Sequence, residues 1–176
     1  MIRWAIRIAM LILAGFGCIL LSAIPLQPGA PQWPMPDLLF ALCCYWILRR
    51  PGSAPLIVVF ALGLAADMLL MRPVGIGALT LVLATEVLRG QSRHLREVPF
   101  VLEWAMVAAL IGMGVAMQAA LIWISLGSPP TVGQLGRYAA GTMLSYPLIA
   151  LICGGLLGLR HRGNGKLTYS TYLGEG

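Results

Sequence analysis

Long apolar runs, separated by short connections, dominate this sequence of 176 residues. Hydrophobic residues make up 59% of the chain and charged residues only 10%, whereas soluble domains average about 25% charged residues. A helix that crosses a bilayer needs roughly 20 apolar residues, so the chain has room for about six crossings and for no sizeable soluble domain. The sequence therefore predicts an integral membrane protein.

We predict an all-α bundle of six transmembrane helices that forms a single domain over residues 1–159, followed by a cytoplasmic tail over 160–176. The predicted spans are about 8–24, 34–48, 54–71, 74–88, 100–126 and 138–159. The first resembles a signal sequence, but its apolar run is long and no convincing cleavage site follows, so we expect it to stay attached. The second is short, and we expect it to draw in Trp33 or to thin the membrane around it.

Basic residues gather at alternate ends of these predicted spans. All but two of the 12 Lys and Arg residues fall on one side of the membrane, and only Arg72 and Arg137 fall on the other. Cytoplasmic loops carry the excess of basic residues in membrane proteins. This asymmetry places both termini in the cytoplasm.

The remaining composition argues against several functions. The net charge of +6 does not indicate nucleic-acid binding, because the basic residues flank apolar runs and form no patch. We expect no metal and no cofactor, since the four cysteines lie in apolar runs as free thiols without metal-site spacing. The sequence also lacks HExxH, GxSxG and nucleotide-binding motifs, so we expect no enzyme activity.

The most informative stretch is 60–79, FALGLAADMLLMRPVGIGAL, which predicts two apolar helices joined by a tight turn at Arg72 and Pro73. It contains an acid, Asp67, inside a lipid-soluble run. A carboxylate at membrane depth normally faces protein, water or a counter-charge. Three interpretations remain open: Asp67 pairs with Arg72 or Arg137 and ties helices together, it handles a ligand or proton, or it docks a partner.

The predicted topology places four charged residues toward the outer half, where they can form one polar network or a partner-binding site: Asp37, Asp67, Arg72 and Arg137. Asp37 is also explained by capping of the second helix. Toward the inner half, Glu86 and Arg89 are three residues apart on one helical face, as in an interfacial ion pair.

Small residues recur at spacings that favour close packing of helices. The candidate packing positions are Gly63, Gly75, Gly77, Gly112, Ala116, Gly154 and Gly158. In the fifth span, small residues repeat every four positions from Ala108 to Ala120 and form a stripe. We expect such a stripe to pack against another helix, either within the bundle or from a partner; a ligand groove is the alternative.

The stretch over 36–88 resembles the rod shape-determining protein MreD family. The residues that carry the resemblance are a Pro-Asp start, a Tyr-Trp pair before a proline, an F-x-x-G-L-x-x-D motif and a Pro-x-Gly turn: Pro36, Asp37, Tyr45, Trp46, Pro51, Phe60, Gly63, Leu64, Asp67, Pro73 and Gly75. Met71 and Arg72 fill positions where the family more often has small or polar residues.

This resemblance implies a non-enzymatic inner-membrane subunit of the bacterial cell-elongation machinery, which helps to position lateral peptidoglycan synthesis. It implies MreC as the first partner, RodA and a penicillin-binding transpeptidase as further partners, and MreB as an indirect one. It also implies a fold similar to the substrate-binding subunits of energy-coupling-factor transporters. The alternative function is therefore that of a solute-binding subunit in such a transporter.

Overall fold

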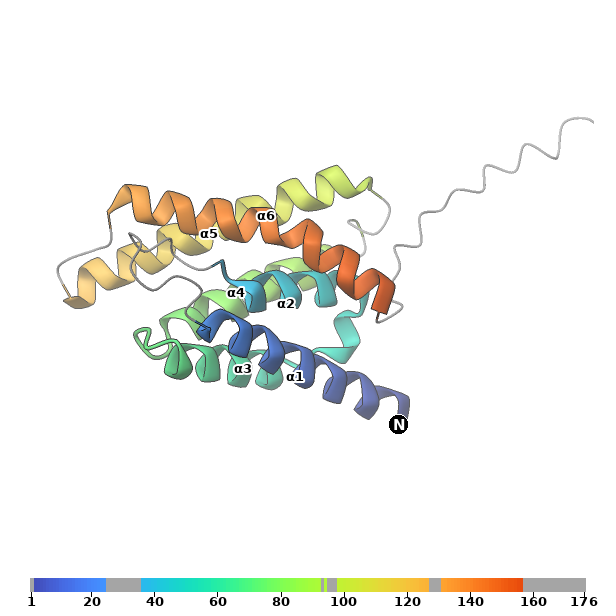
Figure 1. Cartoon of the computed structure of the whole chain (residues 1–176). Helices are drawn as coiled ribbons and strands as arrows, with labels where there is room; N and C mark the ends of the chain where they lie inside the picture. The colour runs from blue at the N-terminus through green and yellow to red at the C-terminus, as the bar shows by residue number, and fades with distance from the viewer. Residues whose placement is uncertain (1, 25–35, 93, 95–97, 127–130, 157–176) are drawn as a thin grey trace, which may run out of the picture.

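The computed structural model describes residues 2–24, 36–92, 94, 98–126 and 131–156, and this part of the chain is helical (Figure 1). Its elements are α1 (Ile2–Ala23), α2 (Leu38–Arg49), the 3₁₀ turn η1 (Pro51–Ser53), α3 (Leu56–Leu69), α4 (Ile76–Gln91), α5 (Phe100–Leu126) and α6 (Val132–Leu156). The all-α expectation is confirmed for the described residues.

The helices fall into a long set and a short set. Helices α1, α5 and α6 contain the segments Trp4–Ala23, Phe100–Ile124 and Val132–Gly155, which are long and apolar enough to cross a membrane. Helices α2 and α3 are apolar but have only 12 and 14 residues, and α4 has 16. Helix α1 begins earlier than the predicted first span and α6 begins at Val132 instead of 138.

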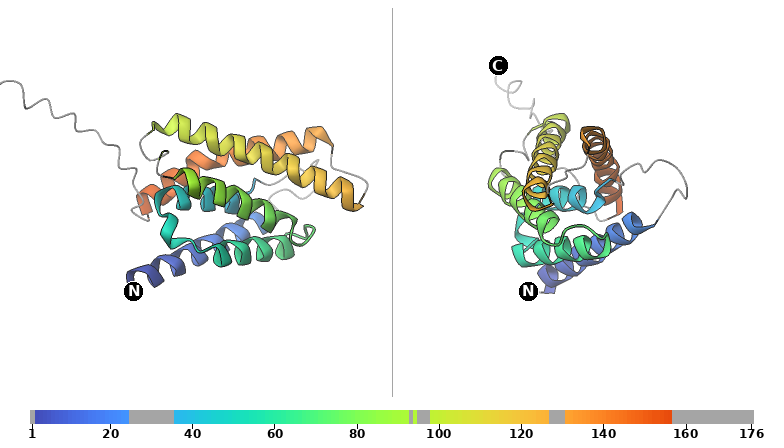
Figure 2. Two further views of the ribbon diagram at one scale, coloured as in Figure 1. Left: turned by 180° about the vertical axis from the view of Figure 1, so that it is seen from behind. Right: turned by 90° about the vertical axis from the view of Figure 1, so that its left-hand side faces the viewer.

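Helix α2 lies at the centre of the bundle, as the end-on view in Figure 2 shows. Every residue from Leu39 to Leu48 is buried, and α2 packs against α1, α4 and α6. A helix that is apolar all round is expected in such a position. At about 18 Å, α2 is shorter than the hydrocarbon core of a bilayer. The prediction was that the membrane thins around this helix, but in the structure neighbouring helices enclose it. Trp33 lies outside the described residues.

Helices α3 and α4 form a close hairpin. A Cβ atom added to Gly63 would come within 2.8 Å of the Cα of Ala78, so only glycine permits this approach. The connection closes when the amide of Arg72 donates to the carbonyl of Asp67 at 2.9 Å. Gly75 then begins α4 with φ of 93°, a left-handed conformation that glycine adopts without strain.

One end of the bundle is organised around η1. The indole of Trp4 donates to the carbonyl of Gly52 at 3.0 Å. Arg89, in the last turn of α4, donates to the carbonyls of Pro51 and Ala54, both at 2.7 Å. The start of α1, the end of α2, the start of α3 and the end of α4 therefore meet at what we call the η1 end. The hairpin between α3 and α4 lies at the opposite end.

Candidate functional site

Asp67 is buried, with only 1% of its surface exposed, and its carboxylate holds the beginning of α4. Its Oδ2 atom accepts hydrogen bonds from the backbone amides of Gly75 at 2.9 Å and Ala78 at 3.1 Å. The first amides of a helix have no partner within the helix and carry partial positive charge, so a carboxylate is favourable there. The polar groups that receive Asp67 are thus backbone amides.

The close approach of Asp67 also explains the glycine at position 77. A Cβ atom at Gly77 would overlap Oδ1 of Asp67. Helix α4 therefore begins with two glycines for different reasons: Gly75 supplies the left-handed conformation and Gly77 leaves space for the carboxylate. The predicted packing role of Gly77 is refined, because what it accommodates is an acid of α3 and not an apolar helix surface.

The second polar cluster joins Asp37, Arg72 and Tyr138. Asp37 caps α2, since its Oδ1 accepts from the amide of Phe40 at 3.0 Å. Its Oδ2 accepts from Arg72 at 3.0 Å and from the hydroxyl of Tyr138 at 2.8 Å. The amide of Asp37 in turn donates to the hydroxyl of Thr142 at 3.0 Å. This cluster ties the start of α2 to the hairpin and to α6.

Arg72 lies in the connection between α3 and α4, with its guanidinium 5.5 Å from the ring centroid of Tyr138. Burial by itself lowers the pKa of this guanidinium, but the neighbouring Tyr138 and Asp37 groups more than offset it and the net direction is upward. Arg72 therefore stays positively charged and serves as the counter-charge of Asp37.

The four predicted polar residues thus lie in three separate places and do not form one network. Asp37 and Arg72 form an ion pair, whereas Asp67 bonds to the start of α4. Within the part of the chain that the structure describes, Arg137 is exposed and no hydrogen bond or ion pair joins it to the other three. Of the three interpretations of Asp67, pairing with Arg72 or Arg137 does not occur in the structure, because its hydrogen-bond partners are backbone amides.

A third polar cluster, which the sequence analysis missed, lies toward the η1 end. Glu103 of α5 is completely buried and accepts hydrogen bonds from one nitrogen of Arg49 at 3.0 and 2.9 Å. The hydroxyl of Tyr146 donates to the same carboxylate at 2.6 Å. Since these residues belong to α5, α2 and α6, the cluster fastens the central helix to both of the long helices beside it.

Aromatic rings surround this cluster. The guanidinium of Arg49 lies 4.9 Å from the ring centroid of Tyr45, a cation–π distance. Tyr146 meets Tyr45 edge to face and stacks on Phe100, with ring centroids 6.2 Å apart in both cases. The buried arginine is therefore held by one carboxylate and one ring face, an arrangement that fixes the position of its charge.

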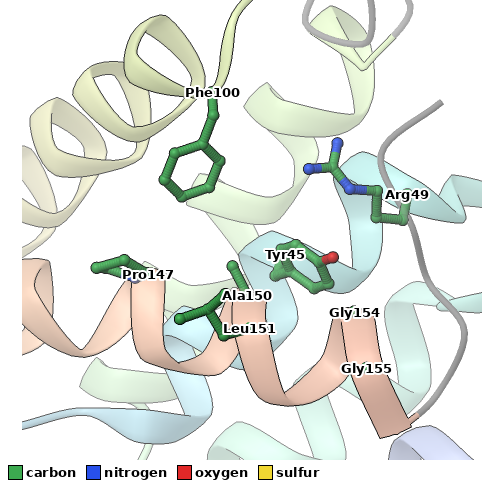
Figure 3. A pocket seen from close by; sticks show the side chains of 8 residues that line it. All are labelled: Tyr45, Arg49, Phe100, Pro147, Ala150, Leu151, Gly154 and Gly155. Carbon is green, nitrogen blue, oxygen red and sulfur yellow. The ribbon is translucent and has the colours of Figure 1, made fainter. Parts of the chain in front are cut away.

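Beside this cluster lies a cavity of about 500 Å³ (Figure 3). Its lining residues come from the end of α2, the start of α5 and the second half of α6: Tyr45, Arg49, Phe100, Pro147, Ala150, Leu151, Gly154 and Gly155. The guanidinium of Arg49 and the hydroxyl of Tyr45 are the polar groups of its wall. Gly154 lies against that hydroxyl, because a Cβ atom there would be 3.4 Å from it.

The remaining packing candidates lie in α5 and α6. A Cβ atom on Gly112 would meet only the methyl group of Met143 at 3.8 Å, an ordinary contact, so this glycine is not required for close approach. Ala116 is exposed on the surface of α5. Gly158 lies outside the described residues. Gly15 of α1 packs closely without having been predicted, because a Cβ atom there would lie 3.0 Å from the side chain of Leu62.

The three clusters share a chemical character. Each charged group that carries them lies against an opposite charge or backbone amides, and in the described ranges no three His, Cys, Asp or Glu side chains gather as metal ligands do. Such arrangements fix helices relative to one another.

Comparison with known proteins now adds one decisive observation. The family model of the rod shape-determining protein MreD matches residues 2–132 of the chain. The chain belongs to the MreD family. The expected family is confirmed, and together with the three long apolar helices it marks the chain as a membrane protein with a role in rod shape determination.

No curated protein and no solved structure matches the chain. The expected likeness to the substrate-binding subunits of energy-coupling-factor transporters therefore has no support, and neither does the transporter function that depended on it. The match to MreD covers α1 to α5 and ends at Val132, the first residue of α6. It includes all three acids of the polar clusters, Asp37, Asp67 and Glu103.

Proposed function

We propose that this MreD family member is a non-enzymatic subunit of the cell-elongation complex in the bacterial inner membrane, and that it helps to assemble and position lateral peptidoglycan synthesis. The family supports a role in rod shape. The described residues form three clusters that fasten helices, so the protein is suited to act as a rigid membrane scaffold with which other subunits associate.

In this proposal all six helices cross the membrane and both termini are cytoplasmic. The contacts at the η1 end support it, because the chain returns to that end at the end of α2, the end of α4 and the start of α5. The basic residues Arg49, Arg50 and Arg89 lie there. Residues of this kind are enriched on the cytoplasmic side.

The observation that carries the scaffold proposal is the exposed face of α5. In the middle of α5 the outward residues recur at helical spacing and are mostly small: Ala105, Ala109, Met113, Ala116 and Ala120. The exposed residues at the two ends of the helix are large. In lipid, apolar burial gives little drive for helix association, and small residues promote it because they let backbones approach closely. This alanine face, defined by the four alanines, is suited to receive a transmembrane helix of a partner.

The choice of partner rests on the family. MreC is the first candidate to occupy the alanine face, with RodA and a penicillin-binding transpeptidase as further members of the assembly and MreB as an indirect one. Lipid covers the remaining apolar surface. Nucleic acid has no place in the proposal, and no cofactor is required.

The test is recovery of MreC with the tagged protein from native membranes. Replacing both Ala109 and Ala116 by Leu should strongly reduce recovery, because the larger side chains keep the partner helix at a distance. The matched control replaces Ala61 of α3 and Ala140 of α6, which are also exposed, by Leu. Depletion of the protein should also turn rod-shaped cells round. Normal recovery of MreC with the double α5 variant, or normal shape after depletion, would reject the proposal.

A further inference from the structure

The cavity beside Arg49 is partly open to the outside of the bundle. Figure 3 shows Phe100 of α5 and the second half of α6 on opposite sides of it, with Arg49 and Tyr45 on a third. Helices α5 and α6 cross near their middles and diverge toward this end (Figure 1). Exposed apolar residues continue from the lining on both helices, including Val101 at 67% exposure and Leu151 at 75%.

The size of the cavity indicates what it can hold. A volume of about 500 Å³ lies within the ~300–1,000 Å³ typical of small-molecule sites. The cavity therefore has the size of a small-molecule site, and the alanine face of α5 is a separate surface.

The lining has an amphipathic pattern. Arg49 and Tyr45 supply a cation and a hydroxyl from α2, whereas the walls contributed by α5 and α6 are apolar or lack side chains. Arg49 is positioned by Glu103 and by the ring of Tyr45, and its side chain is only 7% exposed. A ligand that suits this wall has one polar, hydrogen-bond-accepting end and an apolar chain.

The charge around the η1 end favours an anionic head group. Among the described side chains at this end, basic residues outnumber acidic ones: Arg7, Arg49, Arg50 and Arg89 against Glu86 and Glu103. The guanidinium of Arg49 is neutralised by Glu103, but the surrounding excess of positive charge remains. Basic residues near a membrane surface attract anionic lipids by about 1 kcal/mol each.

We propose that this cavity binds one anionic phospholipid from the surrounding leaflet. One acyl chain enters between α5 and α6 beside Pro147 and Ala150, and the phosphate lies at the Arg49 and Tyr45 wall. The bound lipid completes the packing where α5 and α6 diverge. Lipid binding of this kind goes beyond the proposed scaffold function and does not depend on the identity of the partner.

The test uses the full-length protein, purified in detergent and freed of native lipid. It is incubated with phosphatidylglycerol that carries a photoreactive group on one acyl chain, and the labelled residues are mapped by mass spectrometry. Labelling should fall on the cavity-lining part of α6, from Pro147 to Gly155. Phosphatidylcholine with the same chain should label about fivefold less, which corresponds to the ~1 kcal/mol expected of one basic residue near the surface.

A substitution in the same helix provides the matched comparison. A Cβ atom at Gly155 meets no other atom within 4 Å, so Gly155→Leu places a side chain in the cavity without a backbone clash and should reduce labelling severalfold. Gly136→Leu, which is equally unobstructed but lies at the other end of α6, should label like the unchanged protein.

Three results would overturn the proposal. Labelling outside the cavity, equal labelling by the two lipids, or displacement of the label by inorganic phosphate alone would each show that a phospholipid is not held as described. The map obtained with the unchanged protein decides the matter even where Gly155→Leu fails to fold. Retained labelling in a monodisperse Gly155→Leu protein would also count against it.

Discussion

The carboxylate of Asp67 accepts a hydrogen bond from the backbone amide of Gly75 at 2.9 Å, so that a side chain from the end of α3 begins α4. The acid therefore has its partners in the same hairpin, eight and eleven residues further along the chain. The two short helices and their connection form a unit whose geometry depends on one buried charge.

The first prediction concerns this charge. Asp67→Leu should lower the free energy of unfolding substantially, because each buried amide left without an acceptor costs about 1–3 kcal/mol. Asp67→Asn keeps an acceptor but loses the charge at the helix terminus, an effect of about 0.3–1 kcal/mol. Thermal unfolding in detergent should thus rank the unchanged protein above the Asn variant and the Asn variant above the Leu variant.

Met68→Leu is the matched control, because Met68 is the exposed neighbour of Asp67 in the same helix. It should unfold like the unchanged protein. An Asp67→Leu protein that unfolds at the same temperature as this control would show that the carboxylate does not hold α4.

The second prediction separates two glycines of α4. Replacing glycine by alanine within a helix normally stabilises it by up to about 1 kcal/mol. Gly90→Ala should follow this rule, since a Cβ atom there meets no other atom within 4 Å. Gly77→Ala should instead destabilise the protein, because its Cβ atom would overlap Oδ1 of Asp67. Thermal unfolding of the two variants should therefore shift in opposite directions, and a shift in the same direction would contradict the placement of Asp67.

The sequence predicted that Asp67 needs a polar partner, but it could not identify that partner. The free-energy cost of burying an unpaired carboxylate follows from the residue type and from the apolar residues around it. Whether Arg72 or the amides of α4 become the partner of Asp67 depends on the conformation of the turn. Arg72 lies near both Asp37 and Asp67, yet its guanidinium donates a hydrogen bond to Asp37. The sequence did indicate that a helix begins near Gly75, and the free amides at the start of a helix attract a carboxylate.

For Glu103, unlike Asp67, even the need for a polar partner was not predicted. It occurs in the first turn of a long apolar helix, where an acid is readily attributed to the helix dipole, and Arg49 resembles an ordinary topology signal at the end of a span. Only the packing of α2 between α5 and α6 brings them together. The argument used for Asp67, that an acid within an apolar run needs a partner, applies equally to Glu103 and would have found it.

Helix α2 could be predicted as an apolar segment but not as the central one. Hydropathy does not distinguish a helix enclosed by protein from one that faces lipid, because lipid tails are as apolar as a protein core. The short length of the run, about 18 Å as a helix against a hydrocarbon thickness of about 30 Å, was the available sign that it does not line the lipid boundary.

The third prediction concerns the buried pair of Arg49 and Glu103. Removing one partner of a buried ion pair typically costs about 3–5 kcal/mol, because the other charge is left without compensation. Glu103→Gln and Arg49→Met should each destabilise the protein strongly, and the double variant should be less destabilised than the sum of the two. A double-mutant cycle measured by reversible unfolding in mixed micelles gives this coupling directly.

The matched control for this cycle is the partly exposed pair of Glu86 and Arg89, whose side chains are 41% and 28% exposed. Glu86→Gln should change the free energy of unfolding by less than about 1 kcal/mol, as is usual for exposed ion pairs. If the Arg49 and Glu103 substitutions are additive, the pair does not fasten α2 to α5 in the way its distances indicate.

The last prediction decides whether the short helices cross the membrane. With six crossings and a cytoplasmic amino terminus, a reporter that is active only outside the cytoplasm should give signal after Pro28 and Gly127 and none after Gly90 and Gly163. If only α1, α5 and α6 crossed, Gly90 would lie outside, Gly127 inside and Gly163 outside. The two arrangements therefore give opposite results at three of the four positions. The six-crossing result is expected because the ends of α2 and α4 and the start of α5 meet around Arg49, Glu103 and Arg89, which requires α2, α3 and α4 to pass between the two ends of the bundle. Signal after Gly90 would reject this topology.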